Sequence, residues 1–276
     1  GQRQQWTGET VFTGETHYIK YGFWLEDQAG NRRWLNDRGL FTDMQESGSF
    51  ELLQVNETDI SAVPAWAQGC IYYQIFPERF ARRGPAGAGM DDWNAAPTRD
   101  NVLGGNLGGI IDRIPYLSEL GVECLYLNPI FTGDFNHKYA TTDYFSVDPM
   151  FGTKDTLREL VARCHEAGIR VILDGVFNHS GIHFPPFEDL LKNGEESRYR
   201  GWFYPKRFPI EIDPACYECV GDYPYMPRLN GANGEVRAYV RDVLLYWLRE
   251  AGIDYAMVFS AATSAHQVEH INRYIL

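Results

Sequence analysis

The residues whose types could do chemistry stand together after one apolar run. Residues 171–173 read Val-Ile-Leu, and the polar side chains of Asp174, Asn178 and His179 follow closely. A continuous apolar run is typical of a strand buried on both faces, as in a parallel sheet. Polar groups at the carboxyl end of such a strand lie where α/β barrels place their active sites. The alternative is a core strand whose polar end only caps a loop.

From residue 70 onward, patterns typical of strands and helices alternate along the chain. We expect strands over residues 71–76, 124–127, 171–173 and 255–259, and helices over residues 107–120, 153–167, 233–251 and 265–276. This alternation predicts an α/β protein with a parallel (β/α) architecture. The connections over residues 77–105 and 180–230 are too long for simple loops, so we expect them to shape a binding cleft.

Residues 1–57 have the composition of a small β-structure. Aromatic and β-branched residues fill positions 17–25, a turn signal follows at 28–31, and residues 33–35 and 50–55 are further strand candidates. These strands are too few to close a sandwich. We therefore predict an incomplete β-sandwich-like module over 1–57, followed by a linker over 58–69.

Charge and cysteine content exclude several classes of protein. The net charge of −12 argues against nucleic acids and anionic membranes as partners. The first ten residues contain no apolar signal segment, and no apolar stretch approaches the ~20 residues of a membrane span. The five irregularly spaced cysteines suit a reducing compartment, so we expect a cytoplasmic protein. Cys216 and Cys219 form a single CxxC, without the second ligand pair or thioredoxin-like context that a zinc or redox role needs.

Several motifs occur in order over most of the chain. They are Ile71 to Phe80 (IYYQIFPERF), Asn136 to Tyr139 (NHKY), Thr142 to Pro149, Asp174 to His179 (DGVFNH) and Met226 to Asn230 (MPRLN). Through these motifs the chain resembles the α-amylase family of glycoside hydrolases, within it the cyclomaltodextrinase, neopullulanase and maltogenic amylase group. The resemblance implies a (β/α)8 TIM barrel with a domain inserted after strand three and an N-terminal β-domain. The expected fold is therefore a partial barrel of about four β/α units over residues 70–276, with a loop-rich insertion at about 180–230.

The resemblance also implies an α-linked glucan, such as a cyclodextrin, pullulan or a maltooligosaccharide, as the ligand. Tyr139 offers a flat ring on which a pyranose can stack, and the family places such a platform here. His179 can donate to a sugar hydroxyl, as the matching family histidine does. We expect Asn178 and Asp174 to hold the strand end and to orient this histidine. The insertion's Trp202, Phe203 and Tyr204 are candidates both for sugar contacts and for the core.

The resemblance fails where the family places its catalytic carboxylate. Retaining glycosidases need a carboxylate nucleophile and a carboxylic acid about 5 Å apart. Gly252 to Asp254 fit the family's strand-four motif, but its arginine falls on Met257 and its nucleophile on Phe259. Asp254 would lie about 16 Å from Phe259, near the other end of the strand. The family's acid/base after strand five and its further aspartate after strand seven would lie beyond Leu276. We therefore predict no catalytic residue in this chain and no activity by itself.

A calcium site, which the family group often has after strand one, is also not expected. Calcium binds six or more oxygen ligands. This loop instead carries Arg82 and Arg83, and Asn106 stands where the group has a later acid. Asp91, Asp92 and Asp100 remain, but we predict no metal ion and no cofactor.

Half a barrel leaves open strand edges, and this allows several functions. We expect either a homo-oligomer or pairing with a second half of the barrel. The chain is then a hydrolase completed by other material, an inactive glucan-binding protein, or a half-barrel that serves assembly alone. Residues 255–276 resemble no part of the family, and an engineered, a degenerate or a truncated sequence would each explain them.

Overall fold

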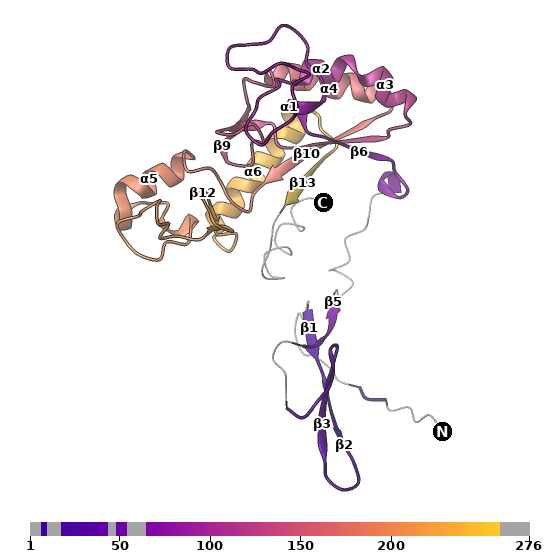
Figure 1. Ribbon diagram of the computed structural model, residues 1–276, viewed down its shortest axis with the longest axis vertical. Coiled ribbons are helices and arrows are strands. Elements are labelled where there is room, and N and C mark those ends of the chain that lie inside the picture. The colour runs from indigo at the N-terminus through magenta and orange to yellow at the C-terminus, as the bar shows by residue number, and fades with distance from the viewer. Residues whose placement is uncertain (1–6, 10–17, 44–47, 54–64, 260–276) are drawn as a thin grey trace. The chain divides into compact units, whose positions relative to one another are not determined.

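The computed structural model describes residues 7–9, 18–43, 48–53 and 65–259, and side chains are not described for Tyr18, Leu52, Leu53 and Tyr255 to Phe259. The chain divides into two compact units, Gly1–Pro64 and Ala65–Leu276, which are described separately below (Figure 1). The helix predicted over 265–276 lies outside the described residues.

In the described residues of the first unit, the strands form two small antiparallel sheets. Strand β1 (Tyr18–Tyr21) pairs with β5 (Phe50–Leu53), and β2 (Phe23–Glu26), β3 (Arg32–Asn36) and β4 (Gly39–Phe41) form the other sheet in that order. The prediction of a single strand over residues 17–25 is wrong, because Gly22 interrupts the extended segment and separates β1 from β2. A Cβ atom there would lie 2.3 Å from the Trp34 ring, so only glycine lets this ring pack against the break.

The second unit is organised around a four-stranded parallel sheet, which confirms the predicted partial barrel. Its order is β13 (Tyr255–Phe259), β10 (Arg170–Val176), β7 (Cys124–Leu127) and β6 (Tyr72–Ile75). Every residue of β7 and all but the first of β10 are buried. The continuous apolar run that predicted β10 reflects this burial on both faces. The short helical turn η2 (Ala65–Ala67) precedes β6.

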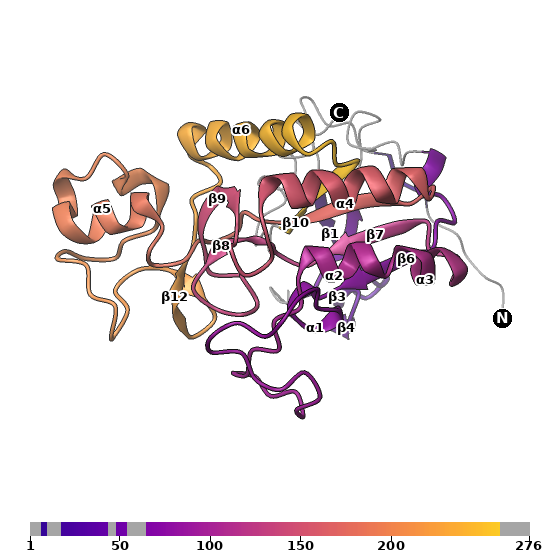
Figure 2. The same cartoon turned by 90° about the horizontal axis from the view of Figure 1, so that it is seen from above.

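Helices cover the sheet between successive strands. Helix α4 (Lys154–Glu166) begins with a capping box at Thr153, and α6 (Gly234–Glu250) begins at Asn233, whose side chain accepts two backbone N–H groups. The two helices lie side by side (Figure 2) and are joined by ion pairs from Lys154 and Arg158 to Glu250. No helix in the part of the chain that the structure describes combines the length and the apolarity needed to cross a membrane.

The helix predicted over 107–120 is in fact two helices. Helix α2 spans Leu107–Asp112, and α3 spans Ile114–Glu119. Pro115 lies in the first turn of α3, where its missing N–H costs nothing, but within one continuous helix it would remove a hydrogen bond and clash with the preceding turn.

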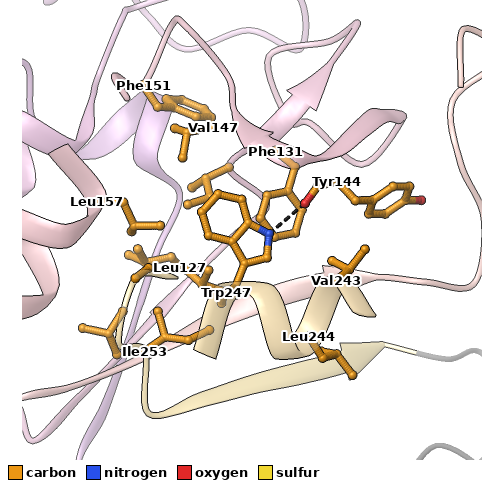
Figure 3. Packing of buried hydrophobic residues seen from close by; sticks show 14 of the residues in the cluster. Leu127, Phe131, Tyr144, Val147, Phe151, Leu157, Val243, Leu244, Trp247 and Ile253 are labelled. Atoms are coloured by element: carbon orange, nitrogen blue, oxygen red, sulfur yellow. Dashed lines mark hydrogen bonds between the residues drawn. The ribbon is translucent and has the colours of Figure 1, made fainter. Parts of the chain in front are cut away.

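Trp247 on α6 packs in the core against the hairpin that follows β7. The buried Trp247 indole donates to the carbonyl of Tyr144 at 2.7 Å, and its ring stacks on Phe131 at a centroid distance of 5.2 Å (Figure 3). Tyr144 and Phe131 belong to the hairpin of β8 (Phe131–Gly133) and β9 (Thr141–Val147), which follows β7. Trp247 therefore fixes the base of this hairpin, whose loop over 134–140 carries Tyr139.

The long connections contain structure of their own. Helix α1 (Pro77–Phe80) follows β6, and the segment after it runs to α2 without a regular element. The insertion holds α5 (Pro185–Asn193), two helical turns, η3 (Gly194–Glu196) and η4 (Arg200–Trp202), and the pair β11 (Cys219–Val220) and β12 (Tyr223–Pro227). Helix α5 and β12 lie together in a lobe beyond the sheet (Figure 1).

Candidate functional site

Three motifs that are far apart in the sequence meet at the carboxyl end of β10. The backbone N–H of Leu229 donates to the carbonyl of Asn178 at 3.0 Å, and Ser180 donates to Pro227 at 3.0 Å. Gly181 donates to Thr141 at 2.7 Å, which adds the start of β9. The residues after β10, the MPRLN segment and the β8–β9 hairpin therefore form one hydrogen-bonded base for the site.

Lys138 anchors the loop that carries Tyr139. Its ammonium group lies 2.8 Å from the Asp148 carboxylate and donates to the Gly133 carbonyl at 2.8 Å, while the side chain is only 4% exposed. Its backbone φ of 57° is uncommon for a residue with a side chain and costs free energy unless the surroundings enforce it. The buried ion pair with Asp148 holds Lys138 in this conformation. The conformation of Lys138 in turn sets the backbone direction at Tyr139.

The Tyr139 hydroxyl joins two strands of the sheet. It donates to Asp174 Oδ2 at 3.1 Å and accepts from Asn128 Nδ2 at 3.1 Å, and Gln74 Nε2 donates to Asn128 Oδ1 at 2.8 Å. Burial, together with the nearby Asp174 carboxylate, raises the pKa of the Tyr139 phenol, so it remains a neutral donor. The Tyr139 ring is thus held in place through its hydroxyl group.

Asp174 orients Tyr139 and not His179, and this differs from the expected role. The carboxylate is 1% exposed, and burial raises its pKa, although hydrogen bonding with Tyr126 and Tyr139 opposes the rise. In the described part of the chain, Oδ1 has no hydrogen-bond partner of good geometry. The sequence could not show this because Tyr139 reaches Asp174 from a separate hairpin.

His179 presents a buried nitrogen to the site. Asn178 Nδ2 lies 3.3 Å from His179 Nδ1, in keeping with the expected orienting role, and the Tyr144 hydroxyl holds the His179 carbonyl at 2.8 Å. Burial lowers the pKa of His179 to about 4, so the ring is neutral at neutral pH. In the tautomer whose Nδ1 accepts from the Asn178 amide, the ring proton resides on Nε2. This atom is buried and has no hydrogen-bond partner of good geometry among the described residues, although the ring also interacts with the Tyr139 backbone.

The register of β13 brings the two apolar replacements to the same end of the sheet. Met257 pairs with Asp174, and Phe259 pairs with Val176, one strand away from the Tyr139 contact. Asp254 lies at the opposite end, where its carboxylate accepts from the Val171 N–H at 2.9 Å and lies 2.7 Å from His165 Nε2. Asp254 thus lies too far along the strand to take the place of the family's nucleophilic carboxylate, whose position is occupied by Phe259 in this chain.

In the loop after β6, the side chains near the expected calcium position have other partners. Arg82 donates to the Leu103 carbonyl, Arg83 pairs with Asp112, and the Asn106 side chain caps α2. Within the described ranges, no three His, Cys, Asp or Glu side chains gather closely enough to hold a metal ion. That the protein needs no metal stays a prediction.

The structure decides between the two roles that the sequence left open for Trp202 and Phe203. Trp202 and Phe203 are buried in the main core, so they pack and do not offer a surface to a ligand. Conversely, sequence reasoning missed Phe135 and His137, which alternate with Tyr139 along the same loop. Their rings stack with a centroid distance of 5.2 Å. The alternation of rings at positions 135, 137 and 139 is the signal that could have found them.

Comparison with known proteins gives relatives that are similar to most of the chain. A cyclomaltodextrinase from a Bacillus species is 44% identical over 257 residues, which are 90% of this chain and 46% of that protein. The intracellular maltogenic amylase of Bacillus subtilis is 44% identical over 208 residues, covering 74% of this chain and 35% of that protein. A solved cyclomaltodextrinase structure matches with a TM-score of 0.71 and 42% identity, covering 96% of this chain and 46% of that chain.

The chain spans less than half the length of these relatives. The family described as "Alpha amylase, catalytic domain" matches residues 74–256, a segment that reaches all four strands of the parallel sheet and includes Tyr139, Asp174 and His179. Because this match covers well over half of the sequence, the chain belongs to the α-amylase catalytic-domain family.

Proposed function

We propose that this chain supplies the sugar-holding half of an α-glucan hydrolase, and that its ligands are maltooligosaccharides or cyclodextrins. The observation that carries the proposal is the Tyr139 ring, held by Asp174 and Asn128 beside the buried Nε2 of His179. This group lies at the carboxyl ends of parallel strands, where barrel enzymes bind their substrates.

The chemistry of the site suits a pyranose ring. The apolar C–H face of a glucose unit stacks on Tyr139, while His179 Nε2–H donates to a hydroxyl of the same unit. Both protein groups are neutral, as the raised pKa of Tyr139 and the lowered pKa of His179 indicate. A neutral site that combines one aromatic face with a buried donor favours a neutral polyol over a charged ligand.

We propose further that the chain binds glucan without cleaving it. Retention at the anomeric carbon needs a carboxylate that forms a glycosyl ester. The position that matches the family nucleophile is Phe259, and the position of its arginine is Met257. Neither a phenyl ring nor a thioether can take that role, and Asp254 is engaged at the other end of the strand.

Calorimetric titration with maltohexaose, run beside an assay for new reducing ends, tests both parts of the proposal. We expect saturable binding of the intact chain without release of reducing ends. Tyr139→Ala should abolish the heat of binding, whereas Tyr116→Ala, an exposed tyrosine on α3, should leave it unchanged. Release of reducing ends by pure protein at the rate of an ordinary glycosidase would contradict the proposed lack of catalytic activity. Absence of binding would contradict the proposed ligand.

The edges of the sheet favour a second role in assembly. In the described part of the second unit, β6 and β13 each pair with a single neighbour, so each leaves one edge open. We propose that a second copy or the other half of a barrel covers these edges. Sedimentation of the purified chain should show a dimer or larger species, and a compact monomer at all concentrations would argue against self-assembly.

We also propose that the protein works in the cytoplasm. Its five cysteines are all free in the structure, and one relative at 44% identity is named an intracellular enzyme. Fractionation of the source cells, followed by detection of the chain, should find it in the soluble cytosolic fraction and not in the periplasm or medium.

A further inference from the structure

Two cysteines lie next to each other where the chain enters the parallel sheet. Cys70 precedes β6, and Cys124 is the first residue of β7. Cys124 belongs to a small buried apolar cluster of β7 and β10 residues, and Cys70 packs against this cluster together with Trp66. The two thiols are close enough for a direct side-chain interaction. We call Cys70 and Cys124 the thiol pair.

Backbone hydrogen bonds hold the two members of the thiol pair side by side. The Ile71 carbonyl accepts the N–H groups of Glu123 and Cys124 at 3.0 Å and 3.2 Å. In return, the Glu123 carboxylate accepts the Ile71 N–H at 2.8 Å. The residue that follows Cys70 is therefore bonded both to Cys124 and to the residue before it. The proximity of the two thiols is thus a consequence of how β6 joins β7.

The two thiols differ in their access to solvent. Cys70 is partly exposed, whereas Cys124 is fully buried. A small oxidant in solution therefore meets Cys70 first, and Cys124 is reached through Cys70. An accessible thiol with a second thiol beside it is the arrangement found in cysteines that are oxidised reversibly.

The protonation of the thiol pair follows the same asymmetry. Burial is the main cause that raises the pKa of both thiols, and it raises the pKa of Cys124 to about 12. The Glu123 carboxylate raises the pKa of Cys70 further, while the Arg170 guanidinium, which lies 4.9 Å from the centre of the Trp66 ring, opposes the rise at both thiols. The reactive thiolate consequently forms on Cys70 more readily than on Cys124.

We propose that Cys70 and Cys124 are a site of reversible oxidation, at which hydrogen peroxide converts the two thiols into a disulfide. The Cys70 thiolate attacks one peroxide oxygen, so that an S–O bond forms, the O–O bond breaks and hydroxide leaves, which is protonated to water. The Cys124 sulfur then attacks the sulfenic sulfur of Cys70. The S–S bond forms, the S–O bond breaks, and the departing hydroxide takes up the Cys124 proton as a second water. Two thiols are oxidised and one peroxide is reduced.

The disulfide fastens an edge of the sheet. In the described part of the second unit, β6 pairs with β7 alone, and the neighbouring side chains of Ile71 and Tyr72 are 54% and 45% exposed. An edge strand with few buried contacts opens more readily than a central one. A bond between Cys70 and Cys124 closes the chain between them into a loop and opposes the separation of β6 from β7. In a reducing compartment such a bond is transient. This inference does not depend on glucan binding.

Peptide mapping of the intact chain tests the proposal. The reduced protein is treated with hydrogen peroxide, the remaining thiols are alkylated, and the digest is analysed by mass spectrometry without reduction. We expect a linked pair of peptides that contain Cys70 and Cys124, which dithiothreitol separates. The linked chain should unfold at a higher urea concentration than the reduced chain. The rate of linkage should rise about tenfold from pH 7 to pH 8, because the thiolate fraction rises with pH below the pKa of Cys70.

Three variants separate the thiol pair from the other cysteines. Cys70→Ala and Cys124→Ala should each show no linked peptides and no rise of the urea midpoint after peroxide treatment. Cys70→Ala is the decisive variant, because it leaves the buried Cys124 side chain in place. Cys219→Ala removes another partly exposed cysteine and should form the link as the wild type does. Circular dichroism should show that each variant is folded.

Two results would overturn the proposal. The first is a peroxide-treated wild type in which Cys70 is recovered as a free thiol or as a higher acid, without a link to Cys124. The second is a Cys70→Ala variant whose urea midpoint rises after peroxide treatment as much as that of the wild type. Neither result would affect the proposed glucan site, which calorimetry tests separately.

Discussion

The hydroxyl of Tyr139 donates to Oδ2 of Asp174 at 3.1 Å, which ties the β8–β9 loop to the end of β10. One bond thereby links the proposed sugar platform to a strand that is buried on both faces of the sheet. Asp174 in turn depends on Tyr139, because the described residues give its other oxygen no hydrogen-bond partner of good geometry. The platform and the strand end therefore stabilise each other, so substitutions at either residue should affect both stability and binding.

Tyr139→Phe tests the two contributions separately. The phenyl ring can still stack on a glucose unit, so glucan affinity should fall by less than about threefold. The loss of the hydroxyl removes the Tyr139 donor from Asp174 and leaves its interaction with Tyr126, which should lower the free energy of unfolding by about 1 kcal/mol. Calorimetry and urea denaturation measure the two quantities. A variant that is as stable as the wild type would show that the Tyr139–Asp174 bond does not contribute to the fold.

Lys138→Met should be among the most destabilising single changes near the site. It removes one partner of a buried ion pair and leaves the Asp148 carboxylate uncompensated, a change that typically costs about 3–5 kcal/mol. Lys154→Met is the matched control. It breaks a pair with Glu250 whose side chains are more than a third exposed, so it should lower the free energy of unfolding far less than Lys138→Met does. Equal losses of unfolding free energy in the two variants would contradict a special role for Lys138.

Trp247→Phe should weaken the contact between α6 and the β8–β9 hairpin. The smaller ring can keep the stacking on Phe131, but it leaves the buried Tyr144 carbonyl without the indole donor and opens a small cavity. We expect a loss of about 2–4 kcal/mol in urea denaturation. Glucan affinity, measured on the folded fraction, should change little, since Trp247 lies in the core and not in the proposed site. A large loss of affinity with unchanged stability would contradict this division of roles.

The sequence predicted the parallel sheet and its helices well, because the patterns that specify each element lie within or next to that element. The apolar run at 171–173 and the caps at Thr153 and Asn233 each lie within the element that they specify. The break in the helix at Pro115 was also encoded locally, but the apolar spacing on either side concealed it. The interrupted strand at Gly22 depends on the Trp34 ring, which belongs to another strand, so no local pattern could reveal it.

The sequence predicted which candidate residues lie together better than it predicted the contacts between them. Tyr139, His179, Asn178 and Asp174 do gather at one end of the sheet, yet Asp174 bonds to Tyr139 and not to His179. Lys138 was missed because its role depends on a left-handed backbone conformation and on Asp148, which lies at the far end of the hairpin. Such contacts depend on the register of β8 with β9, which sequence alone does not fix.

His179→Asn should make the chain less sensitive to acid. Burial lowers the pKa of His179 from 6.5 to about 4, so between these values the unfolded chain binds a proton that the folded chain does not. The contribution of this group to stability is therefore complete above about pH 6.5 and is lost as the pH falls toward 4. At pH 4.5 the loss should be on the order of 2 kcal/mol relative to pH 7. Urea denaturation of wild type and variant at both pH values gives the difference. His183→Asn is the control, because its side chain is 60% exposed, and it should keep the acid sensitivity of the wild type. If His179→Asn loses as much stability between pH 7 and 4.5 as the wild type does, the buried imidazole is not the source of the effect.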